Sequence, residues 1–246
     1  MKVLVISDIH SNWEALQAVL EEAQGTYDEI VCCGDLVGYN ASPAAVLDWT
    51  RQHCRVVTRG NHDKVVAGID SLEWFNEVAQ AAARWTIEQL SEEQLGYLKE
   101  LPIGPLKLKH FHLWHGSPRD EDEYLMGPRE AVPSFEFLEL PLGFFGHTHV
   151  QGIFFSKQRR MSAMMAVPKR ERQVTIELEP DTMYMVNPGS VGQPRDGDPR
   201  AAYALFDSEE KIVVLHRVEY PVQTSAREIR EAGLPEVLAE RLFHGY

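Results

Sequence analysis

One local pattern recurs along this chain and constrains its fold more than any other feature. A short apolar run ends, and an aspartate, asparagine or histidine follows within a few residues. The runs cover residues 3–6, 30–33, 56–57, 111–114, 142–145 and 183–186. Short runs rich in Val, Ile and Phe and bounded by glycine are typical of buried strands. Helical spacing between the first three runs, as in Trp13, Leu16 and Leu20, indicates strand–helix–strand units. We therefore predict an α/β fold with a largely parallel sheet.

The polar residues after these runs are expected to meet at one edge of the sheet. Parallel strands bring their carboxyl ends together, and ligands bind in the crevice beyond those ends. The residues are Asp8, His10, Asp35, Asn61, His62, His115, His147 and His149. Carboxylates, imidazoles and amide oxygens together suit a divalent metal of borderline to hard character. Buried charges gathered in one crevice also need a shared partner, so the set predicts a metal site. The histidines outside the set are interpreted as structural: His53, His110, His112, His216 and His244.

The spacing within this set suggests how two metals are held. Asp8 and His10 are two residues apart, so an extended chain would point both side chains to one side, and His147 and His149 repeat this spacing. Two cations about 3.5–4 Å apart clamp both sides of an in-line phosphoryl displacement. The cations repel each other unless anions lie between them. Asp35 is the natural bridge, and a shared hydroxide is the expected second bridge and nucleophile.

The charge of the chain narrows the choice of partner. With 24 basic and 37 acidic residues among 246, the formal net charge is −13. General nucleic-acid binding requires a basic protein, so this function is excluded. An acidic protein that acts on phosphates needs a local cation to reverse the sign at the site, and bound metals are the obvious candidates. We expect a small phosphorylated substrate, with nucleotides among the candidates.

The cysteines and the N-terminal residues indicate in which cellular compartment the protein is expected. The three cysteines, Cys32, Cys33 and Cys54, are too few for a disulfide framework and are interpreted as packing residues. The apolar run at residues 3–6 is far shorter than the roughly 7–15 residues of a signal peptide or the roughly 20 of a spanning helix. We therefore expect a cytoplasmic protein without a membrane partner. The oligomeric state stays open.

One domain over residues 1–246 is the economical description, with two segments that interrupt the strand pattern. Residues 71–101 are rich in helix formers and are expected to form a helical insert beside the site, with Ser91 capping a helix. The aromatic residues of this insert are interpreted as packing residues rather than substrate contacts: Trp74, Phe75, Trp85 and Tyr97. Residues 156–172 are expected to form a basic loop, either solvated or a flap near an anionic substrate. Its cations are Lys157, Arg159, Arg160, Lys169, Arg170 and Arg172.

The chain resembles the calcineurin-like metallophosphoesterases in five segments that occur in the same order. They are Asp8-Ile9-His10, Gly34-Asp35, Gly60-Asn61-His62-Asp63, His115-Gly116 and Gly146-His147-Thr148-His149. Residues 187–196 extend the resemblance and are similar to the bacterial and archaeal branch of small phosphodiesterases and diadenosine-tetraphosphatase-like proteins. One such segment alone is weak, but five in order are a specific match.

The resemblance implies a fold and a role for each matching residue. The fold would be a four-layer sandwich of two mixed β-sheets flanked by helices. One metal would be held by Asp8, His10, Asp35 and His149, and the other by Asp35, Asn61, His115 and His147. His62 would protonate or stabilise the leaving oxygen, and Asp63 would orient His62. Mn or Fe is favoured by the resemblance alone, because the ligand types also suit Zn, Co, Ni or Mg.

The chain departs from the protein phosphatases and the symmetrical dinucleoside tetraphosphatases at one point. These relatives carry an arginine shortly after the aspartate that corresponds to Asp35, whereas residues 34–40 contain none. Arg119 and Arg195 are the substitutes we consider for phosphate contact. Each has an alternative interpretation as a structural ion pair, with Asp120 or Asp196 respectively.

Three functions remain in competition. A dinuclear phosphoesterase that hydrolyses phosphodiesters or nucleotide pyrophosphate bonds agrees best with the complete ligand set and His62. A phosphomonoesterase, including a protein Ser/Thr phosphatase, is disfavoured by the missing arginine. A non-catalytic scaffold of the same fold should have lost ligands, and this chain keeps all of them.

Overall fold

The computed structural model describes residues 1–158, 160–165 and 167–246, and only the backbone of residues 161–165. The strands are β1 (Lys2–Ile6), β2 (Glu29–Cys32), β3 (Cys54–Val57), β4 (Leu106–Lys107), β5 (His112–Leu113), β6 (Leu142–Phe144), β7 (Gly152–Lys157), β8 (Arg160–Met165), β9 (Gln173–Glu177), β10 (Thr182–Asn187), β11 (Ala201–Asp207) and β12 (Ile212–Val218). The helices are α1 (Trp13–Ala23), α2 (Pro43–His53), α3 (Asn61–Val66), α4 (Glu77–Gln89), α5 (Glu92–Glu100), α6 (Pro128–Ser134), α7 (Val222–Glu231) and α8 (Glu236–His244), with 3-10 turns η1 (Leu72–Trp74) and η2 (Phe135–Phe137).

The strands form two mixed sheets, as the family resemblance implied. The first has the order β3-β2-β1-β11-β12-β9, and the second has the order β4-β5-β6-β10-β7-β8. Each sheet contains one run of three parallel strands: β1, β2 and β3 in the first, and β5, β6 and β10 in the second. The single, largely parallel sheet expected from the strand pattern is therefore wrong. The other strands pair antiparallel, including β1 with β11 across most of the chain length.

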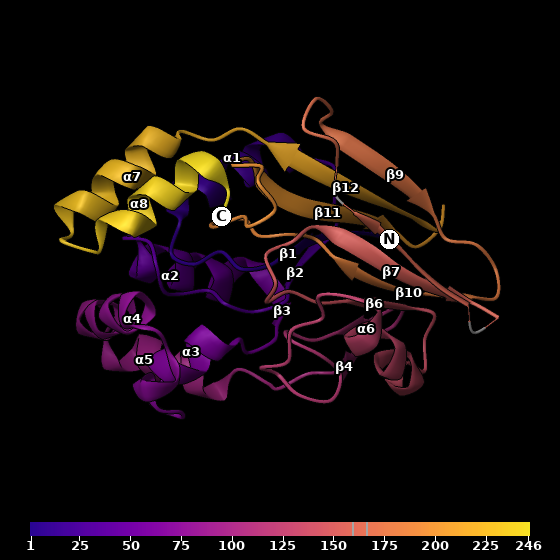
Figure 1. Ribbon diagram of the computed structural model, residues 1–246, viewed down its shortest axis with the longest axis horizontal. Coiled ribbons are helices and arrows are strands. Elements are labelled where there is room, and N and C mark those ends of the chain that lie inside the picture. The colour runs from indigo at the N-terminus through magenta and orange to yellow at the C-terminus, as the bar shows by residue number, and fades with distance from the viewer. Residues whose placement is uncertain (159, 166) are drawn as a thin grey trace.

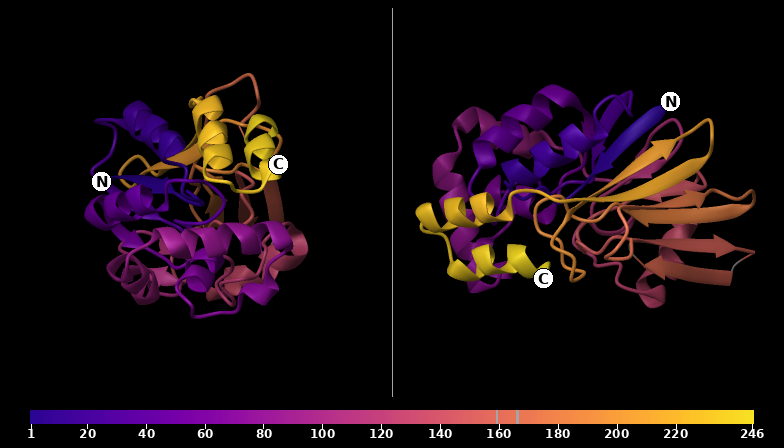
Figure 2. Two further views of the ribbon diagram at one scale, coloured as in Figure 1. Left: turned by 90° about the vertical axis from the view of Figure 1, so that its left-hand side faces the viewer. Right: turned by 90° about the horizontal axis from the view of Figure 1, so that it is seen from above.

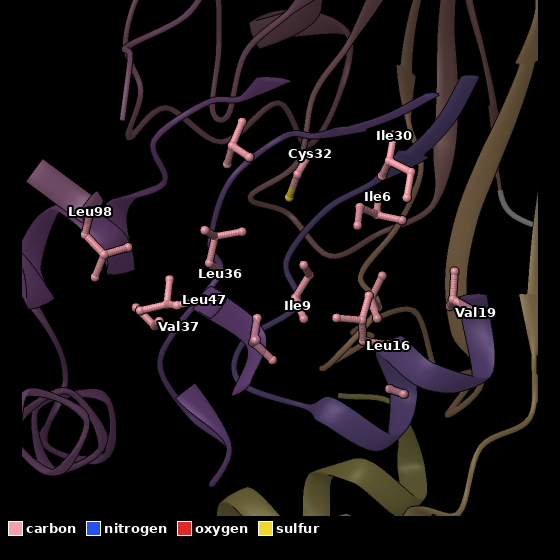
Figure 3. Close-up of a cluster of buried hydrophobic side chains, with 14 of the residues drawn as sticks. Ile6, Ile9, Leu16, Val19, Ile30, Cys32, Leu36, Val37, Leu47 and Leu98 are labelled. Carbon is pink, nitrogen blue, oxygen red and sulfur yellow. The ribbon is translucent and has the colours of Figure 1, made fainter. Parts of the chain in front are cut away.

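The strands of the first sheet bury both faces. In β1, Leu4 and Ile6 face a cluster formed with α1 and α2, whereas Val3 and Val5 face the core between the two sheets. Cys32 and Cys33 divide in the same way, as expected for neighbours on an extended chain. Figure 3 shows the cluster on the outer face, in which helix residues such as Leu16 approach strand residues such as Ile6. The continuous apolar runs seen in the sequence follow from this two-sided burial.

Helices outside the sandwich cover the region where the parallel strands end. Figure 1 shows α4 and α5 on the same side of the molecule as α7 and α8, away from the far ends of β7 to β9. Figure 2 shows α7 and α8 beside each other from two further directions. Side chains of α4, α7 and α8 form one apolar cluster that also contains Tyr39. Residues 71–101 thus fold into η1, α4 and α5, and Ser91 caps α5 through a reciprocal pair with Gln94.

The segment expected as a basic loop at residues 156–172 is not a loop throughout. It contains the end of β7 and all of β8, which pair as an antiparallel hairpin. Lys157 forms an ion pair with Glu179, and Arg159 lies outside the described residues. No described helix is long and apolar enough to cross a membrane.

A buried ion pair joins the two sheets near the ends of the parallel strands. Arg217 of β12 pairs with Asp196, and its side chain has 0% exposure while that of Asp196 has 5%. Arg217 also donates to the Gln151 side chain at 3.0 Å, one residue before β7 of the second sheet. Breaking a buried pair costs much more than breaking an exposed one, because the remaining charge loses its compensation.

We expect Arg217→Met to lower the free energy of unfolding by about 3 kcal/mol, because it leaves Asp196 buried and unpaired. Urea unfolding at neutral pH measures this loss. Arg230→Met is the matched control: it removes an exposed ion pair with Glu236 and should cost less than about 1 kcal/mol. Equal losses in the two variants would contradict a special role for the buried pair.

Candidate active site

The carboxyl ends of the parallel strands of both sheets meet at one place. β1 leads into Asp8 and His10, β2 into Asp35, and β3 into Asn61 and His62. From the second sheet, β5 leads into His115, and β6 into His147 and His149. All of these side chains are buried except that of Asn61, which is half-buried. Five separate segments therefore deliver polar groups into one crevice.

These side chains form two groups with metal-ligand geometry that share one residue. The first group is Asp8, His10, Asp35 and His149, and the second contains Asp35, His115 and His147. Within each group, the candidate ligand atoms lie within 4.8 Å of one another. Asn61 joins the second group, because its amide oxygen lies 3.3 Å from His115 Nε2. Every residue predicted to hold a metal is thus brought to this place.

Backbone carbonyls determine which nitrogen of each imidazole faces the crevice. Nδ1 of His10 donates to the Val37 carbonyl at 2.9 Å, and Nδ1 of His149 donates to the Gln193 carbonyl at 2.6 Å. The Nε2 atoms of these rings then carry lone pairs, and they face each other at 3.0 Å. Two lone pairs at this distance repel unless a cation lies between or beside them. The arrangement fits metal ligation, in which the other ring nitrogen is held by an acceptor.

Backbone carbonyls also orient the imidazoles of the second group, but the two rings use opposite nitrogens as the donor. His115 donates from Nδ1 to the Cys33 carbonyl at 2.8 Å, so its Nε2 faces Asn61 and Asp35. His147 instead donates from Nε2 to the Asp122 carbonyl at 3.1 Å, which leaves Nδ1 as its ligand atom. The reversal is a consequence of which edge of the ring meets the main chain, and spacing in the sequence does not reveal it.

Burial makes the two carboxylates depend on a positive partner. Asp8 is fully buried, and its Oδ2 has no hydrogen-bond partner among the described residues. Burial raises the pKa of Asp8 to about 7. Burial has the same effect on Asp35, but the neighbouring imidazoles, His115 first, hold its pKa well below the ordinary value. Buried carboxylates grouped with neutral imidazoles, one of them with an orphaned oxygen, form a donor set that a divalent cation would complete.

Burial and the neighbouring carboxylates also shift the pKa values of the imidazoles. Burial lowers the pKa of His10 to about 4 and that of His147 to about 3, so both rings are neutral at neutral pH and able to bind a metal. Burial opposes protonation of His115 too, but Asp35 and Asp8 outweigh it and raise the pKa to about 9. A metal would supply the positive charge that this proton otherwise provides, and would replace it.

The metal-site backbone is strained, and here the extended geometry expected from the sequence is wrong. Asp8 and His10 have φ values of +52° and +46°, and His147 and His149 have +67° and +57°. These are left-handed conformations, which non-glycine residues adopt only where the surrounding structure imposes them. The paired residues do reach one crevice, but through tight turns after β1 and β6 rather than as extended chain.

Two close approaches leave no room for a side chain at the neighbouring glycines. A Cβ atom at Gly60 would lie 2.1 Å from Oδ1 of Asp35. Gly38 has a φ of +93°, and a Cβ there would lie 2.6 Å from Nδ1 of His62. These glycines let the loop after β2 and the start of α3 pack directly against Asp35 and His62.

Asp63 occupies a different position from the one its predicted role requires. Its carboxylate accepts hydrogen bonds from the backbone N–H groups of Asp35, Leu36 and Gly60, at 2.8–3.0 Å. Nδ1 of His62 is buried without a partner among the described residues, so no hydrogen bond links the two side chains. Asp63 therefore holds the loop that carries Asp35, and its sequence position beside His62 is misleading.

His62 is held by rings rather than by a carboxylate. Its ring lies 4.4 Å from the Tyr39 and Phe75 rings and 4.8 Å from the His10 ring, measured between centroids. Its backbone N–H donates to Oδ1 of Asp35 at 2.9 Å. Sequence reasoning missed Tyr39, because it follows no strand directly and belongs to no motif. Burial lowers the pKa of His62 to about 3, so the free side chain is neutral.

The two arginines considered for phosphate contact differ in their surroundings. Arg119 pairs with Glu123 rather than with the expected Asp120. Arg195 has no carboxylate partner among the described residues, because the neighbouring Asp196 forms its ion pair with Arg217. The Arg195 guanidinium lies 5.6 Å from the centre of the Tyr39 ring and donates to the Gln193 side chain at 3.0 Å, while its Nε is buried without a partner. The Arg195 guanidinium therefore lies beside the crevice and has N–H donors that are not used in hydrogen bonds within the described chain.

Comparison with known proteins identifies the family to which this chain belongs. The chain belongs to the calcineurin-like phosphoesterase superfamily, whose domain model matches residues 1–211. It is 36% identical over 249 residues to an uncharacterized protein of Methanocaldococcus jannaschii, covering 99% of this chain and 98% of the relative. A metallophosphoesterase of Sphaerobacter thermophilus superposes with a TM-score of 0.87 at 38% identity, covering 100% of this chain and 99% of that one. A hypothetical protein of Pyrococcus horikoshii has the same fold, with a TM-score of 0.77 at 23% identity, covering 100% and 98% of the two chains.

The shared position of Asp35 yields a prediction about metal stoichiometry. The wild-type chain should retain close to two divalent ions after reconstitution and dialysis. His149→Ala and His147→Ala should each retain close to one, since each removes a ligand of one group only. Asp35→Asn should retain close to none, since the carboxylate belongs to both groups.

Elemental analysis of the dialysed proteins measures these ratios, without any need for a substrate. The control is the variant His53→Ala. It removes an exposed histidine at the C-terminal end of α2 that belongs to neither ligand group, so this variant should retain two ions. Two ions in Asp35→Asn would rule out its bridging position.

Proposed function

We propose that this protein is a dinuclear metal-dependent phosphodiesterase. The observation that carries the proposal is the pair of ligand groups that share Asp35. One cation would be held by Asp8, His10, Asp35 and His149, and the other by Asp35, Asn61, His115 and His147. When bound, the two cations would neutralise the phosphate and make water nucleophilic at neutral pH. The mixed oxygen and nitrogen ligands accept Mn, Fe, Zn, Co, Ni or Mg, and we propose Mn or Fe.

The charge available to the substrate favours a diester over a monoester. Arg195 is the cation beside the crevice that lacks a carboxylate partner in the described chain, and residues 34–40 contribute no arginine. A monoester dianion carries one more negative charge than a diester, and would need a further cation to match it. One guanidinium and two metals suit a phosphate that carries a single charge. Nucleotide pyrophosphate bonds are the second substrate class that we consider for this site.

His62 is the group positioned to serve the leaving oxygen. It is absent from both ligand groups and lines the cavity beside them. In hydrolysis of a diester, the oxygen of water forms a new bond to phosphorus and the bond to the leaving oxygen breaks. The leaving oxygen then needs a proton, which His62 would donate. The free imidazole is neutral because it is buried, and the negative charge of a bound phosphate favours its protonation.

We expect His62→Asn to lower the turnover of bis-p-nitrophenyl phosphate by about 100-fold or more, as for the loss of a general acid. The metal content should stay near two ions per chain, since His62 binds neither metal. Steady-state kinetics with Mn²⁺, together with elemental analysis, checks both statements. Retained turnover would remove His62 from the mechanism, and absence of turnover with Mn²⁺, Fe²⁺, Co²⁺ or Zn²⁺ in the wild type would reject the proposed activity itself.

The two arginines provide a matched comparison. Arg195→Gln should lower kcat/KM for the same diester by about tenfold or more, because a charge-assisted hydrogen bond to the phosphate is lost. Arg119→Gln removes the same charge from a partly exposed pair with Glu123 and should change kcat/KM by less than about twofold. Comparable losses in both variants would indicate a general effect of net charge rather than contact at Arg195.

A further inference from the structure

A cavity of about 590 Å³ opens beside His62, and aromatic rings form much of its wall. The four rings are Tyr39, Trp74, Phe75 and Tyr124, and the Tyr124 ring lies 3.7 Å from the His147 ring, measured between centroids. Phe75 and Tyr39 are the same rings that contact His62. The cavity therefore begins where the leaving group of the proposed reaction would depart.

Trp74 is exposed in a way that packing does not explain. Its exposure is 80%, the largest among the large hydrophobic side chains of the described chain. Trp85 and Tyr97 of the same insert pack against apolar clusters, as the sequence predicted for all four aromatic residues. The prediction is wrong for Trp74, which η1 places on the cavity wall. A large ring held in water at the mouth of a cavity is typical of a surface that stacks on a ligand.

The charges around the cavity show what kind of ligand it excludes. Lys64 is the cation among the described lining residues, and its Nζ is already held by Asp70 at 3.1 Å and Asp122 at 2.5 Å. It also lies 3.4 Å from Glu121. The Asp70 and Asp122 side chains are 35% and 46% exposed, so they present acceptor oxygens at the rim. This rim repels a second phosphate, whereas it accepts hydrogen bonds from amino and hydroxyl groups.

Resting on the proposed function, we infer that this cavity is the leaving-group subsite and binds an uncharged flat ring that carries hydrogen-bond donors. A nucleoside has this chemistry, and so does an aryl alcohol. The ring would stack on Trp74 and Phe75, and its donors would face Asp70 and Asp122. A phosphorylated leaving group does not suit the acidic rim. The inference separates the two substrate classes left open above: ester bonds to an alcohol are cleaved in preference to pyrophosphate bonds.

The first test measures binding by the whole chain of residues 1–246 loaded with Mn²⁺, using adenosine and phenol as uncharged probes in calorimetric titrations. We expect at least one probe to bind, and Trp74→Ala to weaken its binding by about tenfold, as for the loss of a base-stacking ring. Trp74→Phe should lose less. The control is Phe137→Ala, which removes an exposed ring of η2 away from the cavity lining and should leave the affinity unchanged. Binding of adenosine identifies the ring as a nucleoside, and binding of phenol alone identifies it as an aryl alcohol.

The second test compares turnover of a dinucleoside monophosphate with that of a dinucleoside diphosphate. The monophosphate releases an uncharged nucleoside, and the diphosphate releases a charged nucleotide. We expect a higher kcat/KM for the monophosphate, and a loss of about tenfold for this substrate in Trp74→Ala. A faster reaction of the diphosphate, or equal probe affinity in the wild type and Trp74→Ala, would overturn the inference.

The two tests separate this inference from the proposed function. If no ester is hydrolysed with any metal, the proposed activity fails, while the binding titrations still report on the cavity. If diesters are hydrolysed but neither probe binds, the activity stands and the subsite is rejected. Thermal unfolding of Trp74→Ala should match that of the wild type, because the side chain is 80% exposed.

Discussion

Two buried carboxylates, Asp8 and Asp35, are the constraint on which the rest of this structure depends. Their exposures are 0% and 1%, so neither has water to stabilise its charge. Backbone N–H groups of His147 and His62 reach one oxygen of each, at 3.0 and 2.9 Å. The remaining oxygen of Asp35 lies 3.4 Å from His10 Nε2 and 3.5 Å from His115 Nε2, whereas the remaining oxygen of Asp8 has no hydrogen-bond partner among the described residues. The left-handed turns after β1, β2 and β6 are maintained because only they bring these groups together.

The position of this crevice follows from the arrangement of the two sheets. Each sheet has a core of three parallel strands, and the carboxyl ends of both cores meet at the same edge of the sandwich. The crevice therefore draws ligands from five segments while the apolar core between the sheets stays closed. Arg217 and Gln151 join the sheets beside the crevice and so hold its two halves in register.

Much of the site could be predicted from the sequence, because each metal ligand follows an apolar strand within a few residues. Asp8, Asp35 and His149 were recognised in this way without knowledge of how the strands pair. The two sheets could not be derived from local pattern, since the pairing of β1 with β11 joins residues about two hundred positions apart and no local signal encodes it. The role of Asp63 was misjudged for a related reason: its neighbours in space are backbone N–H groups of another loop, not the adjacent His62.

The aromatic wall of the cavity comes from residues that belong to neither metal-ligand group: Tyr39, Trp74, Phe75 and Tyr124. Tyr39, α4 and the C-terminal helices α7 and α8 pack into one cluster outside the sandwich, and the superfamily match ends at residue 211, before both C-terminal helices. Mutations of Tyr39 or of residues 74–79 would alter the shape and polarity of the cavity without disturbing a metal ligand or a core strand, whereas α7 and α8 contribute none of its described lining residues. Such a separation lets natural selection change what a phosphoesterase recognises while its chemistry is inherited intact, and it makes residues 74–79 the natural place to engineer a new specificity.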